Sequence, residues 1–231
     1  MDNFDFSVLG RAWPFLLQGL GFTFQVTIVA MAGGIAFGTL LALGRLSPFR
    51  PLVLATAAYV NLMRSIPLIL VIFWFFFLVP ELLGWLIGSE RPVEIGTTRT
   101  ALITFTLFEA AYYCEVIRAG IQSVPRGQVS AARALGLNYG QSMRLIILPQ
   151  AFRAMLPVLL TQTIILFQDT SLLYVISATD FLGAASKIAQ RDGRLVEMYS
   201  FVAIVYFVLC FALSKLVRRL QRRMSRHLAH A

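Results

Sequence analysis

The sequence predicts an all-α integral membrane protein with five transmembrane helices in a single domain, residues 1–231. Of the 231 residues, 58% are hydrophobic and 13% are charged, and the mean hydropathy is +0.75. Ordinary soluble domains have about 25% charged residues, and they could not bury this much apolar surface. Five separate stretches are also long enough to cross a bilayer, which takes about 20 mainly apolar residues.

Glycine and proline distinguish the first two expected spans. The first, about 20–44, contains Gly33, Gly34 and Gly38, which let a neighbouring helix approach closely. The second, about 53–79, is interrupted early by the tetrapeptide RSIP. The other three spans cover about 99–118, 150–170 and 197–216. The half-apolar stretch 171–193 fits a re-entrant or interfacial helix better than a span.

The distribution of lysine and arginine predicts that the N-terminus lies outside and the C-terminus inside. In this orientation thirteen of the 20 basic residues lie in inner loops and the inner tail, against six outside. The inner residues are Arg45, Arg50, Arg118, Arg126, Arg133, Arg144, Arg153, Lys215, Arg218, Arg219, Arg222, Arg223 and Arg226. The outer ones are Arg11, Arg91, Arg99, Lys187, Arg191 and Arg194.

Several other classes of protein are excluded by the sequence. The net charge of +9 comes from basic residues that punctuate hydrophobic runs, which favours a membrane surface over nucleic acid. Cys114 and Cys210 both lie in apolar runs, where packing is a better explanation than a disulfide. The sequence has no phosphate-loop motif and no metal-ligand cluster. We therefore expect a chain that is not itself an enzyme.

A basic, amphipathic segment, residues 125–149, interrupts the hydrophobic pattern on the inner side. We expect Gly136 to end one short helix as a left-handed cap and Asn138 to begin a second. Pro149 should mark the turn into the fourth span. Four apolar residues of the second helix recur on one face: Tyr139, Met143, Ile146 and Ile147. This stripe can cover the chain's own bundle or headgroups, or it can dock a cytoplasmic partner.

Ionisable residues inside the expected spans are costly and therefore suggest a function. Arg64 and Glu109 could neutralise each other, or Arg64 could attract a substrate carboxylate while Glu109 or Asp169 meets its ammonium group. Glu115 and Arg118 are more simply a structural i,i+3 pair. Where the fourth span breaks, polar groups are expected to line a cavity. The candidate substrate-path residues are Arg64, Glu109, Gln168, Asp169, Thr170 and Ser171.

The segment 125–149 resembles the EAA loop of bacterial ABC importer permeases, whose pattern is Glu-Ala-Ala, three residues, Gly, nine residues, Ile-x-Leu-Pro. The matching residues are Ala131, Ala132, Gly136, Ile146, Leu148 and Pro149, and Ser130 replaces the usual Glu. The stretch YVNLMRSIPLILVIFWF resembles the FRxxPL segment of polar amino acid permeases. The stretches FEAAYYCEVIRAGIQS and LFQDTSL most resemble the glutamate/aspartate importers.

This resemblance implies a type I ABC importer permease fold in the bacterial inner membrane. It implies two cytoplasmic ATPase subunits that use ATP and Mg²⁺, a periplasmic binding protein, and a second permease that is either a similar chain or a copy of this one. The chain itself would need no cofactor. The EAA helix would fit a groove of the ATPase. The expected ATPase-coupling residues are therefore Ser130, Ala131, Ala132, Gly136, Ile146, Leu148 and Pro149.

Two rival functions remain to be weighed. A self-contained secondary transporter or channel could also move a small polar solute, but coupled transporters usually show duplicated halves, and none is visible. A membrane scaffold would gain nothing from charges buried at Arg64, Glu109 and Asp169. The EAA-like loop favours the importer over both rivals, and the resemblance implies a permease subunit for polar amino acids, with glutamate and aspartate as the expected substrates.

Overall fold

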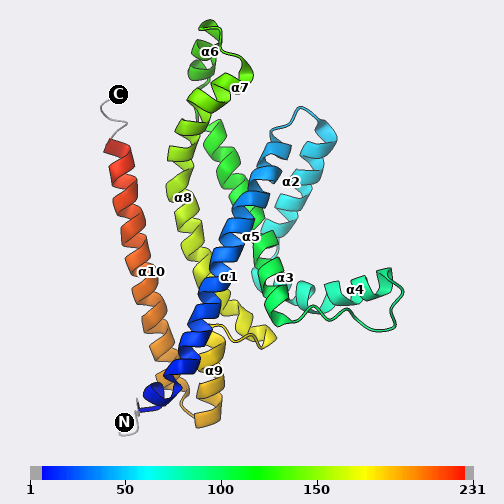
Figure 1. Ribbon diagram of the computed structural model, residues 1–231, viewed down its shortest axis with the longest axis vertical. Coiled ribbons are helices and arrows are strands. Elements are labelled where there is room, and N and C mark those ends of the chain that lie inside the picture. The colour runs from blue at the N-terminus through cyan, green and yellow to red at the C-terminus, as the bar shows by residue number, and fades with distance from the viewer. Residues whose placement is uncertain (1–6, 227–231) are drawn as a thin grey trace.

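The structure is a computed structural model that describes residues 7–226, and every regular element in that range is helical (Figure 1). The elements are α1 (Ser7–Arg45), α2 (Arg50–Ser65), α3 (Leu68–Phe73), η1 (Trp74–Leu78), α4 (Val79–Leu86), α5 (Thr97–Gln122), α6 (Arg126–Ala134), α7 (Tyr139–Ser142), η2 (Met143–Ile147), α8 (Leu148–Asp169), η3 (Thr170–Ile176), α9 (Phe181–Asp192) and α10 (Leu195–Arg226). Within this range, five helical segments are long and apolar enough to cross a membrane: Val8–Arg45, Leu68–Leu86, Thr97–Gln122, Tyr139–Ile176 and Leu195–Arg222. The expected number of spans is confirmed.

The start of α1 and the end of α10 lie toward opposite ends of the long axis (Figure 1). The start of α1 lies beside α9 at one end, whereas α6, α7 and the end of α10 reach the other. This placement suits an odd number of crossings, and it puts the segment 125–149 at the same end as the basic end of α10. The arrangement agrees with an outer N-terminus and an inner C-terminus.

The first helix is longer than the expected span 20–44. It begins at Ser7, and its 39 residues correspond to a length of about 58 Å. The additional turns are held by packing, because Val8, Ala12 and Leu16 recur on one face and are buried against α9 and α10. Their spacing of four residues is typical of an amphipathic helix that covers a core.

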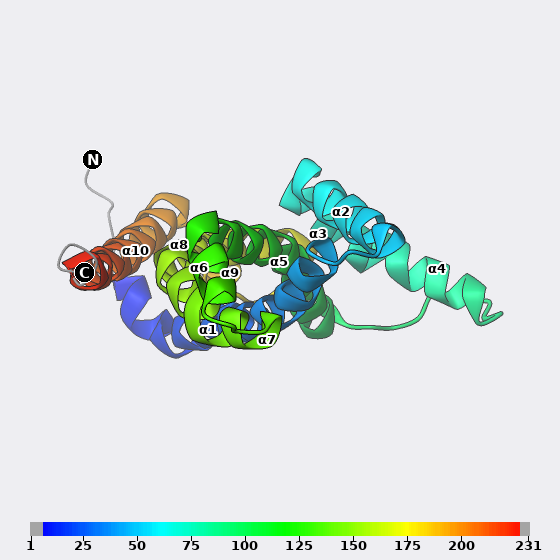
Figure 2. The same ribbon diagram turned by 90° about the horizontal axis from the view of Figure 1, so that it is seen from above.

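The second expected span, 53–79, is not one straight helix. It breaks at Ile66, which has extended backbone angles (φ −109°, ψ 134°) because it precedes Pro67. Beyond the break, α3, η1 and α4 follow one another, and α4 turns away from the bundle, on the opposite edge from α10 (Figures 1 and 2). The interruption at RSIP is confirmed, but the change of direction was not expected.

Two π-helical turns each end two residues before a proline. Trp74–Leu78 precedes Pro80, and Met143–Ile147 precedes Pro149. A proline has no N–H, and its ring needs room in the preceding turn; a wider turn provides that room. Pro149 was expected to mark a turn, and this is wrong: α7, η2 and α8 follow one another without a gap from Tyr139 to Asp169.

The centre of the bundle is the contact between α1 and α5. Gly33, Gly34 and Gly38 all face α5, and a Cβ at Gly33 would lie 2.8 Å from Cγ2 of Thr106. The expectation that these glycines admit a neighbouring helix is confirmed. Packed around this contact are the buried side chains of α5, including Phe105 and Tyr113, neither of which is exposed.

The stretch 171–193 forms no separate span. It contains η3, a left-handed Ser177 (φ 58°) and then α9, which is largely buried between α1 and α10. The close approach of α1 depends on Gly19, where a Cβ would lie 2.8 Å from the carbonyl oxygen of Asp180. The helix α9 lies beside the start of α1 at the outer end of the bundle (Figure 1), as a re-entrant or interfacial segment would.

Candidate functional site

A polar cavity of about 370 Å³ lies where the break between α2 and α3 meets α5 and α8. Arg64 and Asp169 both line it, although they are more than one hundred residues apart in the sequence. The rest of its wall is Ser65, Ile66, Pro67, Leu68, Phe108, Tyr112, Gln162 and Ile165. The cavity wall thus combines a cationic group, an anionic group and apolar side chains.

Arg64 is held at the cavity by α5. It occupies the last turn of α2, and its guanidinium lies over the ring of Tyr112, 5.4 Å from the centroid. Its Nη1 is 3.9 Å from Oε2 of Glu115. The Arg64 side chain is nevertheless 42% exposed, so its donors can still meet a ligand. The alternative in which Arg64 neutralises Glu109 is wrong, because Glu109 is bonded elsewhere.

Of the polar run at the end of α8, Asp169 is the residue that lines the cavity. Thr170 is buried, and its hydroxyl donates to the carbonyl oxygen of Phe167 at 2.7 Å. Gln168 is exposed and interacts with Cys210 of α10, and Ser171 is partly buried in η3. The run therefore does not act as one continuous lining.

Glu109 stands behind the cavity wall. It has no exposed surface, and Nε2 of Gln162 donates to it at 3.1 Å. Gln162 was missed in the sequence because a neutral amide inside a span carries none of the energetic signal that singled out the charges. Its position seven residues before Asp169, on the same helical face, could have indicated it.

At the inner end of α5, Glu115 joins several arginines. Arg118 donates to Glu115 at 2.7 Å and to Gln122 at 2.6 Å, which confirms the expected i,i+3 pair. Arg45 at the end of α1 also forms an ion pair with Glu115. The carboxylate thus fastens the first span to the third beside the inner membrane surface.

The segment 125–149 forms the expected pair of short helices. Gly136 follows α6 with φ +77°, the left-handed region that favours glycine. Asn138 begins α7 in a capping box, in which its side chain accepts from the Gln141 N–H and the Gln141 side chain accepts from its own N–H. The cap of each helix is thus confirmed.

The exposed surface of these helices is mixed. Ala132 and Ile147 are buried, and Ile146 is partly buried. Leu135 and Tyr139 are 79% and 75% exposed. The other coupling candidates, Ser130, Ala131, Gly136, Leu148 and Pro149, are exposed as well. Tyr139 therefore does not cover the bundle together with the rest of its stripe.

At the outer end, Asp180 caps α9. Its carboxylate accepts from the N–H groups of Leu182 at 3.0 Å and Gly183 at 3.3 Å. Burial raises the pKa of the Asp180 carboxyl to about 7, although these two hydrogen bonds and Lys187 oppose the shift. Across residues 7–226, no group of three or more His, Cys, Asp or Glu could hold a metal ion.

A polar cavity inside a bundle of spanning helices is typical of a membrane transport protein. The chain belongs to the family of binding-protein-dependent transport system inner membrane components, whose model matches residues 34–226. It is a multi-pass inner-membrane protein and a transport component.

Curated relatives match over nearly the whole chain. The chain is 52% identical over 223 residues to the glutamate/aspartate import permease protein GltK of Escherichia coli O6:H1, covering 96% of this chain and 99% of the relative. It is 34% identical to the probable glutamine ABC transporter permease protein GlnM of Bacillus subtilis, covering 95% and 98%. The arginine transport system permease protein ArtQ of the same species is 31% identical, covering 96% and 98%.

Solved structures share the architecture. A crystal structure of an amino acid ABC transporter with histidines contains a chain with a TM-score of 0.85 and 29% identity, covering 96% of this chain and 99% of that one. The MetNI methionine ABC transporter in an inward-facing conformation matches with a TM-score of 0.73 at 21% identity, covering 91% and 96%, which supports the fold alone. The predicted permease fold is confirmed.

Proposed function

We propose that the chain is the membrane-spanning permease subunit of an ATP-driven importer for glutamate and aspartate. The observation that best supports this substrate class is the 52% identity to GltK, which extends over 96% of the chain. Relatives named for glutamine and arginine are much less similar, at 34% and 31%. Membership in a binding-protein-dependent family favours this function over a self-contained transporter or channel.

The cavity offers chemistry that suits an amino acid. The guanidinium of Arg64 can bind a carboxylate with two parallel hydrogen bonds, because its donors form a rigid fork. Asp169, which also lines the cavity, can accept from an ammonium group. A bilayer interior is a poor solvent for both ends of a zwitterion, so these partners would replace part of the lost hydration.

The helices α6 and α7 are the proposed contact with a cytoplasmic ATPase dimer that hydrolyses ATP with Mg²⁺. Leu135 and Tyr139 project at the inner end of the chain, and exposed Ala131 and Gly136 have no bulk to keep a partner helix away. The helical elements α7, η2 and α8 are continuous, and Asp169 at the end of α8 lines the cavity. They therefore connect the proposed ATPase contact directly to the cavity. A second permease and a periplasmic binding protein complete the proposed importer.

The substrate proposal is tested by transport. The full complex with its ATPase, in proteoliposomes with the binding protein, should take up labelled L-glutamate when ATP is supplied to the ATPase side. Unlabelled aspartate should compete, whereas lysine and arginine should not. Preference for a basic amino acid would contradict the proposed substrate class. Uptake by this chain without any ATPase would contradict the proposal of an ATP-driven importer.

The coupling proposal is tested at Gly136. Gly136→Leu should uncouple ATP hydrolysis from uptake, because a side chain strains the left-handed cap at the contact. The variant should still insert in the membrane. Gly127→Ala in α6 is the matched control, since a Cβ there meets nothing within 4 Å. Normal uptake by Gly136→Leu would contradict the docking role.

A further inference from the structure

The buried side chain of Glu109 is hydrogen-bonded to Gln162, a residue of the cavity wall. Glu109 on α5 has no exposed surface and is not part of the cavity wall. Its two oxygens lie 3.1 and 3.4 Å from Nε2 of Gln162, which does line the cavity. The contact between Glu109 and the cavity is therefore made by the Gln162 side chain.

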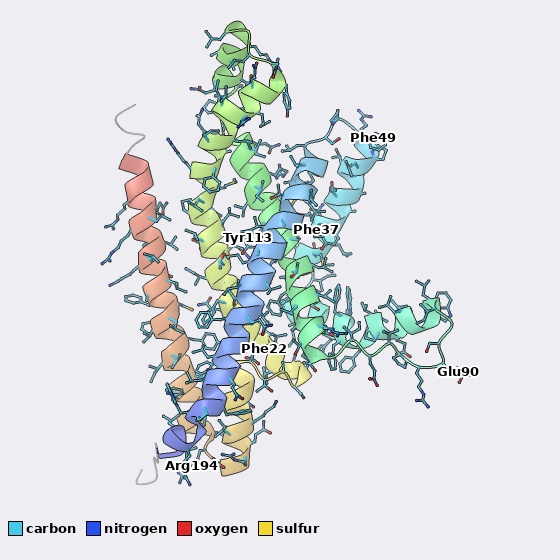
Figure 3. The ribbon with its side chains drawn as sticks, in the orientation of Figure 1. Phe22, Phe37, Phe49, Glu90, Tyr113 and Arg194 are labelled. Carbon is cyan, nitrogen blue, oxygen red and sulfur yellow. The ribbon has the colours of Figure 1, made fainter. Side chains whose placement is uncertain are left out.

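Packing on the other side fixes Glu109 in place. A Cβ at Gly34 of α1 would lie only 3.2 Å from the Cβ of Glu109, so α1 closes directly over it. One turn further along, the hydroxyls of Tyr113 and Thr163 are 3.0 Å apart and join the same two helices. Figure 3 places Tyr113 in the middle of the bundle, where α1, α5 and α8 meet. Because α5 and α8 already share this neutral hydrogen bond, holding them together does not require a carboxylate.

The chemistry of the amide makes the contact directional. A glutamine side chain has donors on its nitrogen and an acceptor on its oxygen, and the nitrogen of Gln162 is the end that faces both oxygens of Glu109. Glu109 therefore holds the nitrogen end of Gln162 toward α5. The carbonyl oxygen is left for the cavity, and a carbonyl oxygen attracts an ammonium group while an amide nitrogen repels it.

We propose that Glu109 is a positioning residue that orients Gln162, so that Oε1 of Gln162 accepts a hydrogen bond from the α-ammonium group of the transported amino acid. Gln162 and Asp169 are seven residues apart on α8 and thus share a face. In this arrangement Arg64 binds a carboxylate, and Gln162 and Asp169 both receive the ammonium group. This inference rests on the proposed function of the cavity.

The test compares L-glutamate with glutarate, the same dicarboxylate without the ammonium group. Binding of each is measured by calorimetry to the permease–ATPase complex in nanodiscs. The wild type should prefer glutamate. Glu109→Gln lets either end of the Gln162 amide face the cavity, so it should weaken glutamate binding about tenfold, as expected for a hydrogen bond to a charged group, and leave glutarate binding unchanged.

Two further variants separate orientation from packing. The exchange Glu109→Gln with Gln162→Glu should restore the preference for glutamate, because the acceptor then faces the cavity again. Thr163→Val removes the neighbouring bond between α5 and α8 without touching the amide, and should keep the preference. Equal losses of both ligands in Glu109→Gln, or an unchanged preference, would overturn the role of Glu109.

The same measurements distinguish this inference from the function on which it rests. If the wild type binds neither ligand, the cavity is not a substrate site, and both the cavity's proposed function and the positioning role of Glu109 are wrong. If the wild type prefers glutamate and Arg64→Gln abolishes binding, while Glu109→Gln leaves the preference intact, the cavity function stands and only the positioning role is wrong.

Discussion

Gly38 of α1 lies against the backbone of Ala110 on α5, so closely that a Cβ at Gly38 would be 2.8 Å from the Ala110 carbonyl oxygen. Backbone cannot move aside as a flexible side chain can. We therefore expect Gly38→Ala to destabilise the protein by about 1–3 kcal/mol, the usual effect of overpacking. The measurement is the thermal unfolding midpoint in detergent.

Gly21→Ala on the same helix is the control, because a Cβ there meets nothing within 4 Å. Its midpoint should be unchanged or slightly higher, since alanine favours helix over glycine. If the two variants unfold alike, the contact between α1 and α5 is not limited by the size of residue 38.

The glycines of α1 and the caps of α6 and α7 illustrate what the sequence could predict. A small-xxx-small spacing and an Asn–Gln capping box act over a few residues, so their physical consequences are contained in the local pattern. The position of Arg64 relative to Asp169 is different. Both residues could be selected as costly charges, but their meeting in one cavity depends on how α2 breaks and packs on α5, which also packs on α8.

The features that the sequence did not predict are contacts between helices distant in the sequence, the direction of a helix, and the role of an uncharged side chain. Arg45 was assigned only to the inner surface, because nothing in its own segment shows that it will reach Glu115. The turn of α4 away from the bundle could not be predicted from an apolar run alone, since hydropathy is the same for a helix that spans and for one that lies sideways. The path of Gln162 to Glu109 likewise required the packing of α5 on α8.

Loss of the carboxylate that fastens α1 to α5 should destabilise the inner end of the bundle. Glu115→Gln leaves Arg45 and Arg118 beside one another without their shared anion. We expect a loss of about 1–3 kcal/mol in unfolding free energy, the range for a desolvated polar group left without its partner. Thermal unfolding of the purified chain in detergent measures it.

The comparison variant is Arg118→Gln, which keeps the Arg45–Glu115 bridge between the two helices. Because it removes a contact within one helix, its effect should be the smaller of the two. A larger loss for Arg118→Gln would show that the link to α1 contributes little.

Arg64→Lys should raise the KM for uptake more than it lowers the maximal rate. A lysine keeps the charge but loses both the flat contact with Tyr112 and the forked donors that match a carboxylate. A fall in affinity of about tenfold is expected from the loss of one charge-assisted hydrogen bond. Uptake kinetics at several substrate concentrations separate the two parameters.

Tyr112→Phe provides the matched test of the stacking contact. It keeps the ring under Arg64 and removes only the hydroxyl, so uptake should remain near the wild-type KM. A strong effect of Tyr112→Phe with none for Arg64→Lys would mean that the tyrosine hydroxyl, and not the guanidinium, binds substrate.

The Asp180 cap should make stability depend on pH. Burial raises the pKa of this carboxyl from 3.8 to about 7 in the folded chain. Between about pH 4 and pH 7 the unfolded chain has lost this proton and the folded chain retains it, so unfolding releases a proton. Stability should therefore fall as the pH rises through this window, by at most about 1.4 kcal/mol per pH unit, and level off above it.

Asp180→Asn should remove that slope, because asparagine stays neutral and caps a helix nearly as well as aspartate. Unfolding midpoints in detergent at pH 5 and pH 7.5 should therefore lie closer together in the variant than in the wild type. Asp192→Asn, at the exposed far end of α9, is the control and should retain the wild-type slope. If the slope persists in Asp180→Asn, a different group releases the proton, and the buried cap is ionised in the folded protein.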